Sequence, residues 1–278
     1  IGGNCVVKLI VSDLDDTLLA DDLTIPEVNV EAISQARAQG ITFTFATGRM
    51  FVSSLPYIRQ LGLPADVPVI CYNGAVIRLA NGHVIYENPL PHELACQIVG
   101  FCADKGWTIN VYYQDVLYVN EINADVEYYT SVARVPAHAV GDLQEFLRQG
   151  RKAPEKILIV SPEELNSGRR AILAAEFAGA AQIVQSKRRY LEITNIDALK
   201  STALMWLTQY LGITMEEVLA VGDSNNDVEM LRTAGIGVAV ANAVPAAKAA
   251  ADHITVSNNE GGVGRAIWDF ALGDNVVK

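Results

Sequence analysis

The chain has 278 residues, which is enough for one large domain or two of ordinary size. Half of the residues are hydrophobic and 19% are charged, a composition that indicates a folded protein and excludes a disordered or collagen-like chain. The net charge of −11, without any basic run, argues against nucleic acid or an anionic membrane surface as a partner. The function must therefore come from a local site.

The cysteines and the lack of long apolar runs indicate a cytoplasmic protein. Cys5, Cys71, Cys96 and Cys102 form no C-x-x-C pair and lie in apolar surroundings, so we expect reduced thiols. No run of about 18 apolar residues is present and the first residues show no basic leader, so we expect no membrane partner. A monomer and a small homo-oligomer are both compatible with this composition.

The first third of the chain predicts alternating strands and helices. Residues 6–11 are a β-branched run, typical of a strand that is buried on both faces of a parallel sheet. Residues 26–39 have apolar positions at helical spacing, and residues 41–46 have the pattern of a second strand, which completes a βαβ unit. We expect a helix over residues 50–61 and a third strand over residues 67–72.

The middle of the chain has a different pattern. It begins after the turn dipeptide Asn73-Gly74 and extends from about residue 84 to residue 190. It predicts a helix over residues 93–103, a hairpin over residues 107–119 and several short strands. This mixture is typical of an α+β domain.

The last third resumes the first pattern. It predicts helices over residues 200–211 and 227–234, and strands over residues 218–221, 237–241 and 253–256. Strands and helices again alternate, as they do at the start of the chain. The two ends of the chain therefore belong to one α/β domain.

The expected architecture is an α/β core that carries an insertion. Residues 1–83 and 191–278 are predicted to form a doubly wound, Rossmann-like parallel sheet, and residues 84–190 an inserted α+β domain. In such a sheet the carboxyl ends of the strands meet at one crevice, which is where ligands bind.

Acidic residues follow two of the predicted strands. Asp13 and Asp15 lie at the end of the first strand, and Asp223 and Asp227 follow the strand over residues 218–221. Two like charges about 4 Å apart repel by roughly 4 kcal/mol at an effective dielectric constant of about 20, so carboxylates gathered in one crevice require a cation. Mg²⁺ is the cation that prefers a few hard oxygen ligands together with water and a substrate phosphate.

The histidines do not indicate a transition-metal site. His83, His92, His138 and His253 are scattered along the chain and form no H-x-x-x-H pair. We therefore interpret them as surface or core residues.

Three further residues suit a phosphate group. Thr47 and Gly48 follow the second predicted strand, and Lys200 begins a helix. A hydroxyl and backbone N–H groups at a strand-to-helix turn suit a phosphate oxygen, and an ammonium group balances its charge. Together with the acidic residues they predict a site for a small phosphorylated metabolite.

These residues resemble the motifs of the haloacid dehalogenase superfamily phosphatases, in particular the Cof-type subgroup with a large inserted C2-type cap. The motifs are DLDDTLL at 13–19, ATGR at 46–49, Lys200, and GDSNNDVEML at 222–231. The sequences NGA at 73–75 and EGGV at 260–263 are similar to the same subgroup. The chain departs from the family pattern at Ser201 and at Asp16, where glycine is more frequent.

The resemblance implies a covalent mechanism. Asp13 would be the nucleophile that becomes an aspartyl phosphate, and Asp15 would be the general acid and base. Mg²⁺ would be bound by Asp13, the backbone carbonyl of Asp15 and Asp223, while Asp227 steadies the site from behind. The groups implied to hold the transferring phosphoryl oxygens are Thr47, the Gly48 N–H, Lys200 and Asn226.

The implied activity is magnesium-dependent hydrolysis of small phosphomonoesters, such as sugar phosphates, with the inserted cap selecting the substrate. Two alternatives stay open: a phosphomutase that uses the same intermediate, and a non-catalytic regulator that carries phospho-aspartate or binds a sugar phosphate. The insertion and the acidic cluster after Lys200 disfavour a phosphorylation switch. No residue of the insertion is assigned to catalysis.

Overall fold

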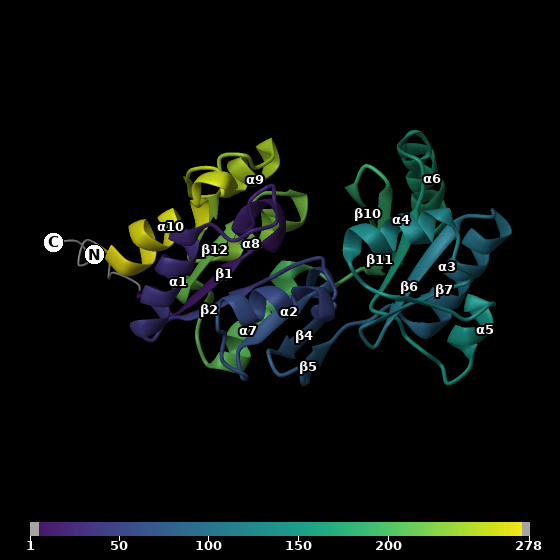
Figure 1. Cartoon of the computed structure of the whole chain (residues 1–278), viewed down its shortest axis with the longest axis horizontal. Helices are drawn as coiled ribbons and strands as arrows, with labels where there is room; N and C mark the ends of the chain where they lie inside the picture. The colour runs from purple at the N-terminus through teal and green to yellow at the C-terminus, as the bar shows by residue number, and fades with distance from the viewer. Residues whose placement is uncertain (1–5, 274–278) are drawn as a thin grey trace. The chain divides into compact units, whose positions relative to one another are not determined.

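The computed structural model describes residues 6–273, except for the side chains of Ser186 and Lys187. The chain divides into two compact units (Figure 1). The first unit holds residues 54–85 together with the chain up to residue 49 and from residue 199 onward, and the second holds residues 50–53 and 86–198.

The first unit is built on a parallel sheet of five strands in the order β14-β13-β12-β1-β2. Every neighbouring pair in this sheet is parallel. The strands are β1 (Leu9–Ser12), β2 (Thr42–Phe45), β12 (Val218–Gly222), β13 (Ile236–Ala239) and β14 (His253–Ile254). The chain adds strands in one direction after β1 and in the other after β12, so the switch point lies between these two strands. The predicted α/β, doubly wound class is confirmed.

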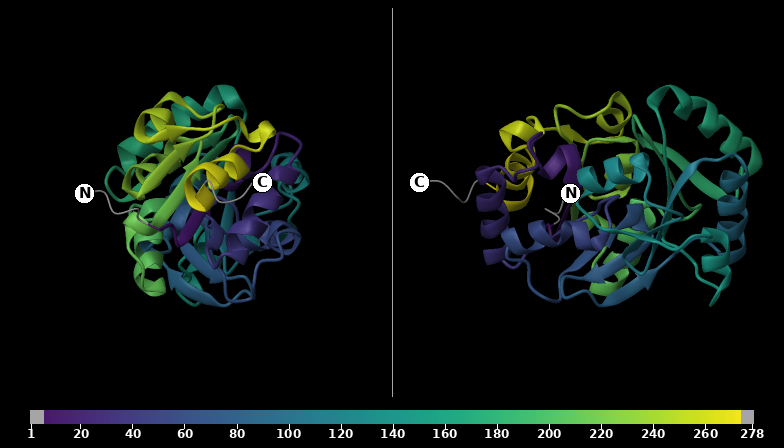
Figure 2. Two further views of the ribbon diagram at one scale, coloured as in Figure 1. Left: turned by 90° about the vertical axis from the view of Figure 1, so that its left-hand side faces the viewer. Right: turned by 45° about the vertical axis from the view of Figure 1, so that its right-hand side comes forward.

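Helices cover both faces of this sheet. Crossovers between parallel strands are right-handed, and those from β1 to β2 and from β12 to β13 run in opposite directions, so their helices are expected on opposite faces. On one face α1 packs against α10, although these helices lie at opposite ends of the sequence (Figure 2). On the other, α8 contacts both α7 and α9. The helices are α1 (Glu27–Ala38), α7 (Lys200–Leu211), α8 (Val228–Thr233), α9 (Pro245–Ala250) and α10 (Gly262–Ile267).

A small antiparallel sheet extends the first one. After helix α2 (Phe51–Gln60), the strands β3 (Pro68–Cys71), β4 (Val76–Leu79) and β5 (Val84–Glu87) form a sheet in that order. A single parallel bridge between Ala46 and Ile70 joins β3 to the end of β2. The predicted third strand is therefore present, but its main partner is the antiparallel β4.

The second unit has its own six-stranded sheet, in the order β10-β11-β9-β6-β7-β8. All of its pairs are antiparallel except β7 with β8. The strands are β6 (Thr108–Tyr113), β7 (Val116–Val119), β8 (Ala137–Ala139), β9 (Lys156–Val160), β10 (Ala181–Lys187) and β11 (Tyr190–Asn195). The predicted hairpin over residues 107–119 is β6 with β7.

Side chains that alternate along β6 separate the two faces of this sheet. Ile109 and Val111 join the buried apolar core that α3 covers, whereas Tyr112 contacts Tyr129 of α4 on the other face. The helices of the unit are α3 (His92–Asp104), α4 (Ala124–Ala133), α5 (Leu143–Arg148) and α6 (Glu163–Glu176). Only α3 was predicted from the sequence.

Two expectations from composition can be placed in the structure. The thiols of Cys71, Cys96 and Cys102 are buried, and Cys5 lies outside the described residues. Across residues 6–273, no helix combines the length and the apolar character that crossing a membrane requires.

Candidate active site

Two acidic residues follow the neighbouring strands at the switch point. Asp13 comes directly after β1, and Asp223 comes directly after β12. These strands are parallel partners, and the backbone N–H of Asp13 donates to the carbonyl of Val221 at 2.8 Å. Both aspartates are buried, with 5% and 9% of their surface exposed. The sheet topology thus places both residues at one edge, as the sequence predicts for parallel strands.

Lys200 links this edge to the first turn of α7. Its Nζ lies 2.7 Å from Asp13 Oδ1 and 2.7 Å from Asp227 Oδ1. The lysine is only 1% exposed and Asp227 is fully buried. A buried ammonium between two carboxylates fixes the positions of all three side chains, because moving any one of them leaves a buried charge without a partner.

The backbone that follows each strand orients the carboxylates. Leu14 N donates to Asp13 Oδ1 at 2.7 Å, and the hydroxyl of Thr17 donates to Asp223 Oδ1 at 2.8 Å. The chain can reverse between Leu14 and Thr17 because Asp16 adopts a left-handed conformation with φ of +56°. Aspartate tolerates that region better than most residues that carry a Cβ atom, so this turn can form without glycine.

Asp227 is held from behind. Its Oδ2 accepts the backbone N–H groups of Asp223 (3.1 Å) and Ser224 (3.0 Å), while its Oδ1 accepts from Lys200. A Cβ atom at Gly222 would lie 2.6 Å from the Cβ of Asp227, so the strand end has no room for a side chain there. Both oxygens of Asp227 are thus engaged by the protein, which suits a residue that supports the site.

Burial dominates the electrostatics of this cluster. Burial, and then the charge of Asp227, raise the pKa of Asp13 well above its ordinary value, although Lys200 lowers it. Burial, followed by the charge of Asp227, raises the pKa of Asp223 to about 6. Burial lowers the pKa of Lys200, but the charges of Asp13 and Asp227 outweigh it, so the net pKa shift is upward. The lysine therefore stays charged.

The cluster fits a divalent cation. Asp13, Asp223 and Asp227 offer carboxylate oxygens that all lie within 4.8 Å of one another. With Lys200 included, the formal charge is about −2 when all four groups are ionised, each Asp carrying −1 and the lysine +1. Burial and then the charge of Asp227 raise the pKa of both Asp13 and Asp223, and a bound cation would favour their ionised forms. Hard oxygen donors in a buried, negatively charged cluster suit Mg²⁺.

Asp15 has a partner that the sequence did not reveal. Arg49 Nε donates to Asp15 Oδ2 at 2.8 Å and Arg49 Nη2 donates to Oδ1 at 2.6 Å, which is a bidentate ion pair. The guanidinium also lies over the ring of Tyr57, 5.3 Å from its centroid. Burial lowers the pKa of Arg49, but the hydrogen bonds and the charge of Asp15 outweigh this effect. The net pKa shift is therefore upward. Arg49 belongs to the ATGR sequence, so its position in a motif was the available signal.

The loops that carry Thr47, Gly48 and Asn226, three of the residues predicted to bind phosphate, both contact Asn73. Thr47 is buried two positions after the end of β2, and its hydroxyl accepts the backbone N–H of Arg49 at 3.1 Å. Asn226 Nδ2 donates to Asn73 Oδ1 at 2.9 Å, and the same Asn73 amide packs on Gly48. The dipeptide Asn73-Gly74 predicts only a turn, so the role of Asn73 between these two loops could not be read from the sequence.

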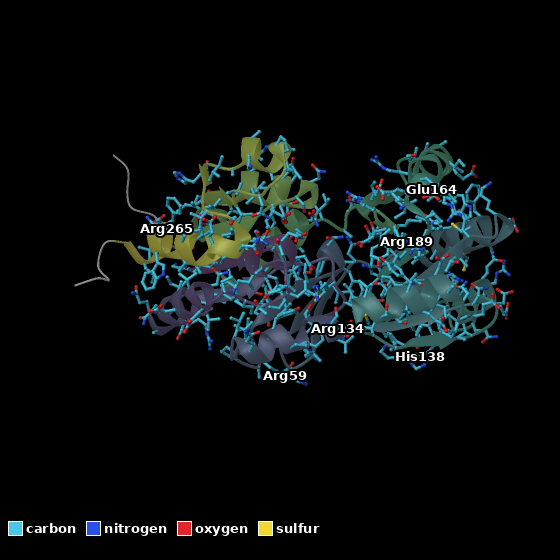
Figure 3. All side chains as sticks on the ribbon, turned by 45° about the horizontal axis from the view of Figure 1, so that its top comes forward. Arg59, Arg134, His138, Glu164, Arg189 and Arg265 are labelled. Atoms are coloured by element: carbon cyan, nitrogen blue, oxygen red, sulfur yellow. The ribbon has the colours of Figure 1, made fainter. Side chains whose placement is uncertain are left out.

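The carboxylate cluster of Asp13, Asp223 and Asp227 contains no histidine among the described residues. His138 lies on β8 of the second unit (Figure 3), and His253 stacks on Phe270 with ring centroids 4.3 Å apart.

Comparison with known proteins gives consistent results. The sequence model of the haloacid dehalogenase-like hydrolase family matches residues 10–267. The 5-amino-6-(5-phospho-D-ribitylamino)uracil phosphatase YitU of Bacillus subtilis (strain 168) is 30% identical over 278 residues, covering 94% of this chain and 97% of that protein. The structure of TM0651 from Thermotoga maritima gives a TM-score of 0.85 at 30% identity, covering 94% and 97% of the two chains. The HAD subclass IIB sugar phosphatase BT4131 gives a TM-score of 0.78 at 26% identity, covering 94% and 98%.

Proposed function

Because the chain belongs to the haloacid dehalogenase-like hydrolases and is a phosphatase of the Cof type, we propose that it hydrolyses small phosphomonoesters through an aspartyl phosphate on Asp13. The observation that carries this proposal is the buried contact of Asp13 with Lys200 beside Asp223 and Asp227. Sugar phosphates and related metabolites are the proposed substrates, in line with the names of the similar proteins YitU and BT4131.

Asp13 is the proposed nucleophile. Leu14 N and Lys200 Nζ both donate to its Oδ1, so the plane of the carboxylate is fixed relative to the backbone and to α7. A fixed carboxylate can attack phosphorus in line with the departing oxygen without first losing rotational freedom. The attack forms an Asp13–phosphorus bond and breaks the bond from phosphorus to the alkoxide.

Asp15 is the proposed acid and base. It would protonate the departing alkoxide and then accept a proton from the water that attacks the aspartyl phosphate. In this structure both of its oxygens accept hydrogen bonds from Arg49. A carboxyl group that donates a proton must give up at least one of these bonds, so release from Arg49 belongs to the proposed cycle.

The proposed metal ligands are Asp13, the backbone carbonyl of Asp15 and Asp223. When bound, Mg²⁺ would neutralise charge on the transferring phosphoryl group. Asp227 keeps its place behind the site, because its oxygens are taken by Lys200 and by two backbone N–H groups. Lys200 therefore orients Asp13 and also brings positive charge next to the phosphoryl position.

The remaining groups would hold the phosphoryl oxygens. They are the hydroxyl of Thr47, the N–H of Gly48, the ammonium of Lys200 and the amide of Asn226. Phosphoryl transfer depends chiefly on positioning and electrostatic stabilisation, so fixed donors of this kind account for most of the expected rate enhancement.

A screen for phosphate release tests this proposal. The wild-type protein is incubated with Mg²⁺ and a panel of sugar phosphates, nucleotides and pyridoxal or flavin phosphates. We expect release of inorganic phosphate, its loss in excess chelator and its recovery when Mg²⁺ is restored. Asp13→Asn should abolish turnover with an unchanged circular dichroism spectrum, while Asp66→Asn, at an exposed aspartate, should keep it.

Two results of this screen would overturn the proposal. One is full turnover by Asp13→Asn after contaminating phosphatase and deamidation have been excluded. The other is formation of an isomeric sugar phosphate without free phosphate, which would identify a phosphomutase instead.

A further inference from the structure

The turn between β3 and β4 has an unusual backbone. Three consecutive residues have positive φ angles, with Tyr72 at +52°, Asn73 at +57° and Gly74 at +104°. Tyr72 is fully buried. Left-handed conformations are sparsely populated for residues that carry a Cβ atom, and they persist where the surrounding structure enforces them. Such strain concentrates at functional sites, so the contacts of this turn identify what it serves.

The turn is hydrogen-bonded to the loop that follows β2. Asn73 N donates to the carbonyl of Thr47 at 2.9 Å, and Tyr72 N donates to the carbonyl of Arg49 at 3.0 Å. A Cβ atom on Gly48 would lie 3.0 Å from Asn73 Oδ1 and 3.2 Å from Asn73 Nδ2. The amide of Asn73 therefore lies directly on Gly48, and the positions of the two groups depend on each other.

The same amide reaches the loop that follows β12. Asn226 Nδ2 donates to Asn73 Oδ1 at 2.9 Å, and Ser224 Oγ donates to Asn226 Oδ1 at 2.5 Å. The hydrogen bonds on its two ends fix the orientation of the Asn226 amide. The acceptor of one of these bonds is Asn73, which is 153 positions away in the sequence.

The next residue of the turn touches the start of α7. A Cβ atom on Gly74 would collide with the carbonyl oxygen of Leu199, the residue that precedes Lys200. Only glycine permits this approach. The Tyr72–Gly74 turn is therefore in contact with all three segments that carry Thr47 with Gly48, Lys200 and Asn226.

We infer that Asn73 is a positioning residue for the phosphoryl group, which it aligns through Asn226 and Gly48. This inference rests on the proposed function, because the groups that Asn73 aligns are the proposed phosphoryl ligands. Its amide joins two of the three segments directly. Loss of that amide should loosen phosphate binding while the fold stays intact.

Asn73→Gly tests this inference, because glycine accepts the left-handed backbone and removes only the side chain. The matched control is Asn81→Gly, since Asn81 Oδ1 accepts only within its own hairpin turn, from His83 N at 2.9 Å. Inorganic phosphate is titrated calorimetrically into each protein in the presence of Mg²⁺. We expect at least about tenfold weaker phosphate binding for Asn73→Gly, as for loss of other groups that orient ligands from behind, and unchanged binding for the control.

A double-mutant cycle separates positioning from a general loss of stability. If Asn73 acts through Asn226, the variant that combines Asn73→Gly with Asn226→Ala should bind phosphate about as weakly as Asn226→Ala alone. Two full losses that multiply would contradict the inference. So would Asn73→Gly binding phosphate with wild-type affinity.

Asn73→Asp provides a test that does not depend on how well the glycine variant folds. Aspartate keeps the size of the side chain, tolerates the left-handed backbone and retains an oxygen that can accept from Asn226. It also places a negative charge on Gly48, so phosphate binding should weaken about tenfold, and more at low than at high ionic strength. Wild-type affinity at both ionic strengths would overturn the inference.

The two proposals fail in different ways. A wild-type protein that hydrolyses esters while Asn73→Gly matches its phosphate affinity contradicts the role of Asn73 alone. A wild-type protein that binds phosphate but hydrolyses no ester contradicts the proposed function, and the phosphate titrations still decide the role of Asn73.

Discussion

At the residue scale, Lys200 supplies part of the positive charge that the acidic residues require, in addition to the proposed metal ion. Carboxylates gathered at the ends of β1 and β12 need positive charge, and the buried ammonium of Lys200 supplies part of it to Asp13 and Asp227. Asp223 receives instead a hydroxyl hydrogen bond from Thr17. The cluster remains negatively charged, and Asp13 and Asp223 are the residues that we propose bind the metal ion which would neutralise it.

The pKa of Asp223 predicts how the metal-free protein responds to pH. Its pKa is about 6 in the fold, compared with 3.8 for an unperturbed aspartate, because burial and the charge of Asp227 disfavour the carboxylate. Between these two pH values the folded state holds the proton more tightly than the unfolded state does. Stability from this group is therefore present below about pH 4 and lost as pH rises toward 6.

The measurement is urea denaturation in excess chelator at pH values from 4 to 7, for the wild type and for Asp223→Asn. The wild type should lose stability relative to the variant as pH increases, because the asparagine does not titrate. Parallel stability curves for the two proteins across this range would show that Asp223 is not the group described.

At the residue scale the sequence could identify groups that stand at element ends. The pattern of apolar residues indicates where a strand ends or a helix begins, and this made it possible to identify Asp13, Asp223 and Lys200. Arg49 and Asn73 could not be assigned roles, since their partners Asp15 and Asn226 lie far away in the sequence, outside the strands and α-helices. Loop geometry depends on tertiary contacts that no local pattern records.

At the element scale, glycines set how closely the loops approach the strands. Gly222 ends β12, and a Cβ there would lie 2.7 Å from Asp227 Cγ. By contrast, Gly168 lies inside α6 with nothing within 4 Å of where a Cβ would stand. The same substitution should therefore have opposite effects at the two positions.

Gly222→Ala should destabilise the protein by about 1–3 kcal/mol, because the added methyl group displaces Asp227 and strains the packing. It should also lower phosphatase activity, since Lys200 moves with Asp227. Gly168→Ala should stabilise the protein by about 0.5–1 kcal/mol through helix propensity and leave activity unchanged. Denaturant titrations and phosphate release measure both; equal stabilities for the two variants would contradict this packing argument.

Elements buried on both faces were the easiest to predict. The strands β1, β12 and β13 are continuous apolar runs, and the predicted ranges overlap the observed ones. The hairpin of β4 and β5 was missed although Asn81-Gly82 is a turn dipeptide at its tip. The helices α4, α5 and α6 were missed because α5 is short (Leu143–Arg148) and because few residues of α4 and α6 are buried apolar side chains.

At the scale of the whole molecule, the second unit has the features of an independently folding domain. Its apolar core combines α3, β6, β9 and β11 with parts of α5 and α6. The two ends of the segment meet within the unit, since Asn195 Nδ2 donates to the carbonyl of Pro89 at 2.8 Å. Adjacent ends are a feature of insertions that do not disturb the host domain.

We therefore expect residues 86–198, expressed alone, to fold cooperatively and to hydrolyse no phosphomonoester. Circular dichroism and thermal unfolding of this fragment check the first expectation, and phosphate release checks the second. A fragment without a cooperative transition would show that its core depends on the rest of the chain. Phosphate release by the fragment would contradict the assignment of the reacting groups to the first unit.

The most direct test is identification of the phosphorylated residue. The Asp15→Asn variant lacks the proposed base for the second step, and p-nitrophenyl phosphate has a leaving group that needs no proton. Acid quenching of this variant with Mg²⁺ and that ester, followed by borohydride reduction and peptide mapping, should reveal homoserine at position 13. Two results would contradict the covalent role of Asp13, provided that the wild type turns over the ester. One is the absence of homoserine at position 13 in the quenched variant, and the other is a reduced residue at a different position.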